Sequence, residues 1–363
     1  MSTPLVRWTS PAAGKTPPEP FLARFEGCGD AIRRLHAPRA ESSAGYAATV
    51  LRAALAGPPE LVIVEDGGRD VARAAFFPCA SRERTGAVGM YEALPGEVGD
   101  RATSRILDAA LAWAASRGLG ELVAPVDANT WFANRFVLPE PESSTAPPPY
   151  SWEPQNPPEY PERFRRHGFA DIERYETRGF WFARDSPYAI ENVVAHTRKG
   201  WDGAAAAGLS IDRLNGDADV PAFLDELHPV CMEAFAENPL FEPVPPALFG
   251  AMYGEGLARA RGHLTFYARD GGGRLAGFVF AFPDRDAVVV KTVAVAPRAR
   301  GVGLSSALLH AVFRAAGEAD VERFVSALIR RGNASEFLAR PHVLPAADTW
   351  LREYVVLGRG VRE

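Results

Sequence analysis

Hydrophobic positions along this chain follow two periods, one typical of buried strands and one typical of helices. Residues 288–295 hold five valines in eight positions, and an apolar, β-branched run of that length favours a buried strand. Pro297 ends the run, since proline cannot donate to a sheet ladder. Between Leu304 and Ala316 apolar residues recur at steps of three and four, as on the buried face of a helix. A strand, a short loop and a helix are therefore expected in succession.

The rest of the chain shows the same kind of pattern twice. In the first half we expect a helix at 48–56, strands at 60–64 and 71–77 joined by an Asp-Gly-Gly turn, a strand at 87–94, a helix at 103–117 and a strand at 121–126. In the second half we expect a strand at 209–214, helices between 220 and 260, a hairpin turning at 270–273, the strand and helix above, a strand at 323–329, a short helix near 334–339 and a strand at 351–357. The repeated order predicts two similar domains, the first with a proline- and aromatic-rich insertion at 127–160.

The loop between the valine-rich strand and its helix has the composition of an anion site. The first amides of a helix lack acceptors within the helix, and the helix dipole adds positive potential there. Gly301 and Gly303 permit backbone geometry that side chains forbid, and Arg298 and Arg300 add positive charge. The third glycine of a dinucleotide-binding turn and the Gly-Lys-Ser/Thr of a nucleotide P-loop are both missing from this stretch.

The string VAVAPRARGVGLSSALL, in which R-x-x-G-x-G follows a strand ending in V-x-P, resembles the acyl-CoA pyrophosphate loop of the GNAT superfamily of N-acyltransferases. Residues 160–169 are similar to a helix of that family that ends in Gly-Phe, and the segments NPPEY and AFAENPLFEPVP resemble bacterial tandem acetyltransferase-like proteins. The resemblance implies an α/β (α+β) fold of two tandem GNAT-like domains, each a mixed, mostly antiparallel twisted sheet flanked by helices. We expect a first domain at 1–185, a linking helix at 186–207 and a catalytic domain at 208–363.

The resemblance also implies where the acyl donor, acetyl-CoA, would bind in the second domain. The loop and first-turn amides, with the Ser305 hydroxyl, would hold the pyrophosphate. The amides of Val293 and Val295 would meet the pantetheine arm and polarise the thioester carbonyl. Asn333 matches an asparagine that lies near that arm in the family. The full set of expected donor-binding residues is Val293, Val295, Arg298, Arg300, Gly301, Val302, Gly303, Leu304, Ser305 and Asn333.

The first half differs at the corresponding loop. Overlaying the two repeats places Glu97, Asp100 and Ala102 at the positions of Arg298 and the two loop glycines. Two carboxylates would repel a pyrophosphate, and an aspartate restricts the backbone where a glycine does not. The same acids are favourable as caps near a helix start. We therefore expect the first domain to be a degenerate copy that does not bind CoA in the usual way and instead shapes the substrate cleft.

The acceptor amine must be neutral to attack, so a base or a water path is required. In the family the loop between the first two helices lines the acceptor site, and here that loop is residues 235–242. Its acids Glu237 and Glu242 are the candidate bases, and Phe241 is a candidate contact for the acceptor. Lys291 lies inside a valine-rich strand. It is either a partner for a substrate carboxylate or a lysine that extends to water.

The family's usual acid is a tyrosine that protonates the leaving thiolate. That tyrosine has no counterpart here, because Phe337 and Leu338 occupy the expected positions. The remaining candidates for the acid are Tyr354, Tyr267 and solvent.

The composition of the chain argues against several kinds of binding partner. The net charge of −5 argues against a general nucleic-acid binder. Cys28, Cys79 and Cys231 are too few and too far apart for a disulfide framework or a metal site. The N-terminus lacks the apolar core of a signal peptide, and no apolar run approaches the ~20 residues of a membrane span. We expect a cytoplasmic monomer or homodimer without metal, nucleic acid or membrane as partners.

Three functions are consistent with these observations. The leading expectation is transfer of an acyl group, most simply acetyl, from CoA to the amine of a small molecule or peptide by direct attack on the thioester. The second is a tandem GNAT that takes an aminoacyl group from charged tRNA, which the loop at 298–303 and the acidic charge disfavour. The third is a non-catalytic CoA-binding sensor, which the missing tyrosine favours.

Overall fold

A computed structural model describes residues 5–9, 11–12, 15–36, 45–142, 144–182, 188–215, 219–260, 264–319, 321–332 and 349–361. The first half contains β1 (Leu5–Thr9), α1 (Glu19–His36), α2 (Tyr46–Ala53), β2 (Glu60–Asp66), β3 (Arg69–Pro78), β4 (Thr85–Ala93), α3 (Gly96–Ser116), β5 (Glu121–Ala124), β6 (Phe136–Val137), α4 (Glu159–Arg166) and β7 (Ala170–Trp181). The second half contains α5 (Ile190–Ala206), β8 (Ser210–Arg213), α6 (Val220–Phe235), α7 (Pro246–Ala260), β9 (Phe266–Arg269), β10 (Leu275–Asp284), β11 (Ala287–Val295), a 3-10 turn η1 (Pro297–Ala299), α8 (Leu304–Gly317), β12 (Arg323–Arg330) and β13 (Thr349–Gly360).

Most predicted elements are present where the hydrophobic pattern places them. β11 contains the valine run, and α8 begins directly after Gly303. β2 and β3 form the predicted hairpin around Gly67 and Gly68, whose positive φ angles suit a tight turn. β9 and β10 form the second predicted hairpin. The helix expected near 334–339 lies outside the described residues.

Two helices differ from the expectation, and the short strands β1 and β6 were not expected either. α1 was not predicted, although it presents Phe25, Cys28 and Ile32 to the core at steps of three and four. α3 begins at Gly96 rather than at 103, so residues expected to form a loop are helical. Gly27 and Gly29, which have low helix propensity, weaken the sequence signal for α1.

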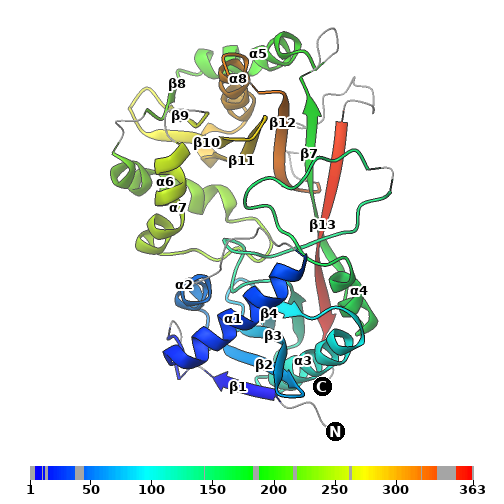
Figure 1. Cartoon of the computed structure of the whole chain (residues 1–363). Helices are drawn as coiled ribbons and strands as arrows, with labels where there is room; N and C mark the ends of the chain where they lie inside the picture. Colours follow the sequence, from blue (N-terminus) through cyan, green and yellow to red (C-terminus); the bar gives the residue numbers. More distant parts are fainter. Residues whose placement is uncertain are drawn as a thin grey trace.

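The described strands form one sheet of 13 strands, in the order β1-β2-β3-β4-β5-β13-β7-β12-β11-β10-β9-β8, with β6 beside β13. The pairs β4–β5 and β11–β12 are parallel, and the other pairs are antiparallel. The two halves exchange their final strands, because β7 pairs with β12 while β13 pairs with both β5 and β7. Figure 1 shows β7 and β13 running through the junction of the two lobes. A strand from each half of the sequence therefore completes the sheet of the other.

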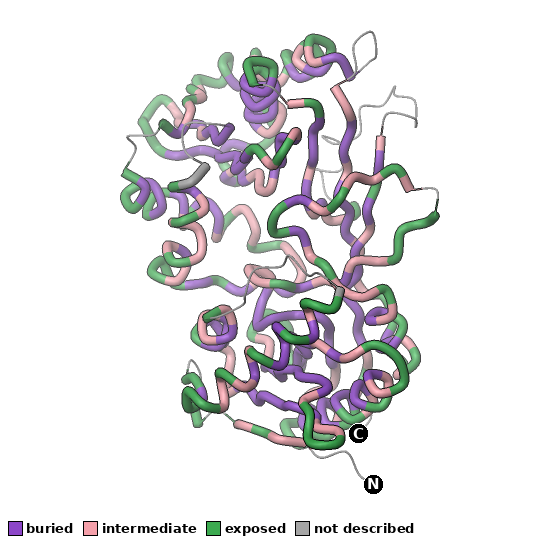
Figure 2. Tube along the Cα trace, viewed as in Figure 1, coloured by how far each residue is buried: buried purple, intermediate pink, exposed green. Residues whose placement is uncertain are grey.

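Helices cover both faces of this sheet. In the first half α3 and α4 pack on one face and α1 and α2 on the other. In the second half α6 and α7 pack on one face and α5 and α8 on the opposite one. Buried positions follow the strands and the inner sides of the helices (Figure 2). Leu240 of the second half packs in the cluster beneath α1 and α2, so the junction between the halves is itself partly apolar.

Candidate functional site

The candidate site begins where the ladder between β11 and β12 stops. Their parallel pairing covers the first four residues of β11, as far as Val290 opposite Ser326, although both strands continue. β11 stays paired with β10 as far as Val295, with a bulge at Lys291. The two strands therefore separate beyond Val290. The β12-facing edge of β11 has no ladder partner there among the described residues.

The amides of Val293 and Val295 point to that unpaired edge. The N–H of Ala296 donates to the carbonyl of Ala276 on β10 at 2.9 Å. Because successive N–H groups of a strand point to opposite edges, the amides of Val293 and Val295 are directed away from β10. The side chains of both valines and of Lys291 are half-buried. Among the residues that the structure describes, these two backbone donors have no partner where the strands separate.

The loop before α8 has the backbone geometry of an anion-binding turn. Gly301 and Gly303 have φ angles of 83° and 82°, a left-handed conformation that favours glycine. Gly303 is the N-cap residue of α8, so the amides of the first turn have no acceptor within the helix. Val302 and Ser305 are half-buried and Leu304 is buried. The geometry is that of a loop able to bind an anion through its backbone.

The two arginines of the loop differ in their surroundings. Arg298 donates to the carbonyl of Leu275 and lies 3.9 Å from the carboxylate of Asp270, so it braces the loop against the β9–β10 hairpin. Arg300 is exposed, and its Nη2 lies 3.5 Å from the carbonyl of Ala234 at the end of α6. Arg300 is therefore the loop arginine available to an anion, and it brings the end of α6 beside the loop.

The helix α5 packs against the start of α8. A Cβ atom on Gly200 would lie 2.5 Å from Cβ of Ser306, and one on Gly303 would lie 3.0 Å from Cα of Gly200. In the same interface Oγ1 of Thr197 and Nδ1 of His310 are 3.1 Å apart. Glycine at 200 therefore allows α5 to reach the loop directly.

The corresponding loop of the first half is missing. α3 begins at Gly96, only three residues after Ala93, the last residue of β4. The guanidinium of Arg163 lies against the first turn of α3. Arg163, 1% exposed, donates to the carbonyl of Leu94 at 3.0 Å and to Oδ1 of Asp100 at 2.7 Å. Arg166 pairs with the other oxygen of Asp100 at 3.2 Å. The chain's own charged groups thus cover this helix start.

The chain also fills the gap between β4 and β5, the counterpart of the gap between β11 and β12. Pairing of β4 with β5 covers three residues, after which Val126 donates to the carbonyl of Val88 at 3.0 Å. The carboxylate of Asp127 accepts the N–H of Met90 at 2.6 Å and the hydroxyl of Tyr46 at 2.9 Å. Burial raises the pKa of Asp127 to about 6. The Met90 amide and the Val88 carbonyl of β4, which lie at this gap, are therefore already bonded.

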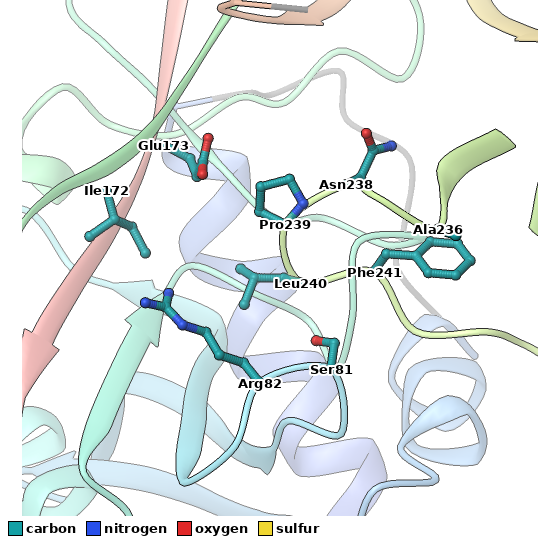
Figure 3. Close-up of a pocket in the computed structure, with 9 residues that line it drawn as sticks. All are labelled: Ser81, Arg82, Ile172, Glu173, Ala236, Asn238, Pro239, Leu240 and Phe241. Carbon is teal, nitrogen blue, oxygen red and sulfur yellow. The ribbon is translucent and has the colours of Figure 1, made fainter. Parts of the chain in front are cut away.

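A cavity of about 550 Å³ lies between the two halves, lined by Ser81, Arg82, Ile172, Glu173, Ala236, Asn238, Pro239, Leu240 and Phe241. Figure 3 shows the loop that follows α6 on one side of it and the β7 residues Ile172 and Glu173 on the other. Glu173 pairs with Arg330 at 2.9 Å. The ring of Phe241 lies 5.7 Å from that of Trp131. The predicted acceptor loop therefore lines a cavity.

The two acids of this loop have different environments. Glu237 is exposed. Glu242 is buried and accepts the N–H of Ala80 at 2.6 Å and that of Ser81 at 3.4 Å. Burial raises the pKa of Glu242, and these two hydrogen bonds oppose the shift. The backbone carbonyl of Glu242 also accepts Nε1 of Trp131 at 2.7 Å. Glu242 therefore joins the two halves through three hydrogen bonds.

Tyr354 is fully buried on β13. Its hydroxyl donates to the carboxylate of Glu153 and lies 2.9 Å from Oγ1 of Thr177. Glu153 also accepts Nη1 of Arg352 at 2.8 Å, and Thr177 accepts the N–H of Leu328 at 3.2 Å. Burial raises the pKa of Tyr354 well above its ordinary value. Tyr354 thus holds a buried polar cluster together at the exchanged strands.

Three residues named in the sequence analysis cannot be compared with the structure. Asn333, Phe337 and Leu338 lie outside the described residues. Within the described ranges no cluster of His, Cys, Asp and Glu side chains could hold a metal ion. The helices of the same ranges include none long and apolar enough to span a membrane.

Comparison with known proteins agrees with this geometry. Residues 192–329 match the family model of the acetyltransferase (GNAT) domain. A tandem GNAT protein from the clavulanic acid biosynthesis pathway, solved without AcCoA, superposes with a TM-score of 0.54 at 15% identity over 99% of both chains. A probable N-acyltransferase from Enterococcus faecalis gives 0.54 at 10% identity over 98% of this chain and 73% of that one. A GCN5-related N-acetyltransferase from Anabaena variabilis gives 0.51 at 11% identity, with 98% and 73% covered. Curated protein sequences gave no match.

The fold combines α and β structure and is similar to the folds of these acyltransferase structures. More narrowly, residues 192–329 form a GNAT acetyltransferase domain, and the chain as a whole has the tandem GNAT fold. The predicted fold class is therefore confirmed, and the predicted family is confirmed for residues 192–329.

Proposed function

We propose that the chain is an acyl-CoA-dependent N-acyltransferase, most simply an acetyltransferase, with one donor site formed by β11 and the start of α8. The observation that carries the proposal is the combination of an interrupted β11–β12 ladder with the left-handed glycines of the following loop. The open edge gives two backbone donors for an extended pantetheine arm. The helix start offers unpaired amides and Arg300 for a pyrophosphate.

In the proposed reaction the neutral amine of the acceptor attacks the thioester carbonyl carbon of acetyl-CoA. The C–N bond forms as the C–S bond breaks, the amine loses one proton, and the CoA thiolate leaves and gains one. An amide of Val293 or Val295 would stabilise the negative charge that develops on the carbonyl oxygen, because a fixed dipole needs no reorganisation during the reaction. Arg298 would act by bracing the loop, through its bonds to Leu275 and Asp270.

For the first half we propose a supporting role without a donor site. Arg163 and Asp100 cover the start of α3, and Asp127 occupies the gap beside β4. A pyrophosphate there would meet a carboxylate, and a pantetheine arm would have to displace a buried chain segment. The first half would instead form one wall of the cavity that Phe241 and its neighbours line.

For the proton transfers we propose Glu237 as the base, directly or through water, because it is exposed on the cavity loop while Glu242 is bonded to two amides. Tyr354, as a buried hydroxyl bonded to Glu153, would orient its neighbours, with solvent as the acid for the thiolate. Glu237→Gln should lower kcat by about 100-fold or more, the usual contribution of general base catalysis. Glu233→Gln, an equal change at an exposed position near the end of α6, should leave kcat unchanged.

The experiment that tests the donor site introduces one negative charge at the start of α8. In Ser305→Glu the carboxylate suits a helix N-terminus, so folding is retained. A unit charge about 5 Å from a phosphate repels it by about 3 kcal/mol at an effective dielectric of about 20. Acetyl-CoA should then bind on the order of 100-fold more weakly. Ser210→Glu makes the same change on the exposed edge strand β8 and should have no effect.

Release of CoA thiol from acetyl-CoA in the presence of a panel of amines measures the activity itself. Thiol release that Ser305→Glu and Ser210→Glu reduce equally would contradict the proposal. Release of amino acid from a charged tRNA, with none from acetyl-CoA, would show a transferase with a different donor.

A further inference from the structure

Lys291 directly follows Val290, the last residue of β11 paired with β12, and stands two residues before Val293, whose amide is assigned to the donor. It is the bulged residue of β11, placed between Val290 and Thr292 in the pairing with β10. It is half-buried, and burial, with Arg135 as the next cause, lowers the pKa of Lys291 to about 8. Lysine is a costly residue at such a position unless its charge has a partner.

A second cation, Arg135, lies close enough for its charge to act on Lys291. Arg135 comes from the insertion of the first half, and its guanidinium lies 4.0 Å from the ring centre of Tyr175 on β7. Tyr175 pairs with Arg330 at the far end of β12, four residues beyond Ser326. Lys291 on β11 and Arg135, which lies over Tyr175 of β7, are therefore both near the end of β12 at which the β11–β12 ladder is open.

Neither cation has an acidic partner among the described residues. Lys291 makes no hydrogen bond or ion pair there, and Nε of Arg135 is buried without an acceptor. The acid whose charge acts on Lys291 is Glu153. It is already bonded to Arg352, to the Tyr354 hydroxyl and to the backbone of Tyr150. Within the described part of the chain, these two positive groups therefore have no anionic partner of their own.

We propose that Lys291 and Arg135 bind a carboxylate of the acceptor, so that the amine acylated at this site belongs to an amino acid or to another small amine that carries a carboxylate. The inference rests on the proposed acyltransferase function and names its substrate class. A carboxylate has the charge and the acceptor oxygens that an ammonium and a guanidinium require. Held there, it would place the amine beside the open edge of β11 and the thioester.

In this proposal the binding of the acceptor depends on both halves of the chain. Lys291 comes from the second half, whereas Arg135 comes from the insertion of the first and rests on Tyr175 of the exchanged strand β7. The first half would thus contribute an anion-binding group to a reaction whose donor site lies entirely in the second.

The test compares acceptors that differ only in the carboxylate. The probes are the twenty standard amino acids, β-alanine and γ-aminobutyrate, each beside its own carboxamide, with acetyl-CoA as donor and CoA thiol release as readout. We expect at least one acid to be acetylated with a kcat/KM about 10- to 100-fold above that of its amide, the usual effect of losing a charge-assisted hydrogen bond. Equal rates for every acid and its amide would overturn the inference.

Two variants then assign the effect to the two cations. Lys291→Met and Arg135→Met keep much of the side-chain volume and remove a charge that has no described partner, so the fold should be retained. Each should raise KM for the acid by about 10- to 100-fold while leaving the amide unchanged. Lys199→Met, at an exposed position of α5, is the control. Loss of kcat for acid and amide alike in Lys291→Met would make Lys291 a proton acceptor and would overturn the carboxylate site.

Binding of acetyl-CoA separates failure of this inference from failure of the acyltransferase itself. If acetyl-CoA binds normally but no carboxylate-bearing amine in the panel is acetylated, the inferred acceptor class is wrong while the donor site stands. If acetyl-CoA does not bind, the proposed function fails, and the inference fails with it.

Discussion

Replacing Asp127 by asparagine tests whether the buried carboxylate that fills the gap between β4 and β5 destabilises the folded state. The carboxylate is buried and accepts the N–H of Met90 and the hydroxyl of Tyr46. Asparagine has nearly the same shape and can still accept from Met90 through its amide oxygen. The substitution therefore removes the charge and keeps the contact.

The magnitude follows from the pKa of the carboxyl group. Burial is the largest cause that raises it from 3.8 to about 6, with Glu92 adding to the shift and Met90, Tyr46 and Arg73 opposing it. An acid whose pKa is higher in the folded state binds its proton more tightly there. The contribution of this carboxyl group to the free energy of unfolding is therefore fully present below about pH 4. It is lost as the pH rises through about 6. A shift of about two units corresponds to about 3 kcal/mol, of which about 2 kcal/mol develops between pH 4.5 and 7.5.

The assay is urea unfolding of wild type and Asp127→Asn at several pH values between 4.5 and 7.5. The free energy of unfolding of the variant, relative to wild type, should rise by about 2 kcal/mol across this range. Any difference in hydrogen bonding would add a constant that does not change with pH. Asp108→Asn, the same change at an exposed position of α3, is the control. A difference between Asp127→Asn and wild type that is the same at every pH would refute the reasoning.

The remaining predictions concern the packing of the two halves. Gly200→Ala should lower the free energy of unfolding by about 1–3 kcal/mol, because its Cβ would lie 2.5 Å from Ser306. Gly250→Ala, in the interior of α7 with open space around it, should raise it by about 0.5–1 kcal/mol. Thermal unfolding measures both changes in the free energy of unfolding. A change of the same sign in the two variants would contradict the close approach of α5 to α8. Glu242→Ala leaves two backbone N–H groups of the β3–β4 loop without an acceptor and should cost about 1–3 kcal/mol; an unchanged melting temperature would argue against a bond between the halves.

The parts of the fold that could be predicted from sequence are those fixed by local pattern. The valine run of β11, the period of α8 and the glycines at 301 and 303 each act within a few residues, and all three appear in the structure. The family resemblance rests on the same stretch, which explains why it identified the domain correctly.

Exchange of β7 and β13 could not be predicted from the sequence, because strand pairing joins residues that are far apart in the chain. β7 and β13 pair with each other and each also pairs with a strand of the opposite half. The alternation of hydrophobic and polar residues in β7 or β13 does not indicate which strand will lie beside it. The start of α3 was misplaced for a related reason, since Arg163, distant in sequence, caps the turn that Glu97 and Asp100 occupy.

The backbone geometry of the loop before α8 could be predicted from its glycines, whereas the surroundings of the candidate acceptor residues could not. Glu242 and Glu237 look alike in sequence, and tertiary contacts with Ala80 and Ser81 distinguish them. The sequence did not indicate a role for Arg135, because its proximity to Lys291 arises only when the chain folds.

Calorimetric titration with acetyl-CoA tests the central claim, a single donor site in the second half, most directly. We predict a stoichiometry of one acetyl-CoA per chain for the wild type. Binding should be on the order of 100-fold weaker in Ser305→Glu and unchanged in Glu97→Gln, which changes the exposed acid at the start of α3. Two acetyl-CoA molecules per chain, or binding that Ser305→Glu leaves intact, would contradict the account.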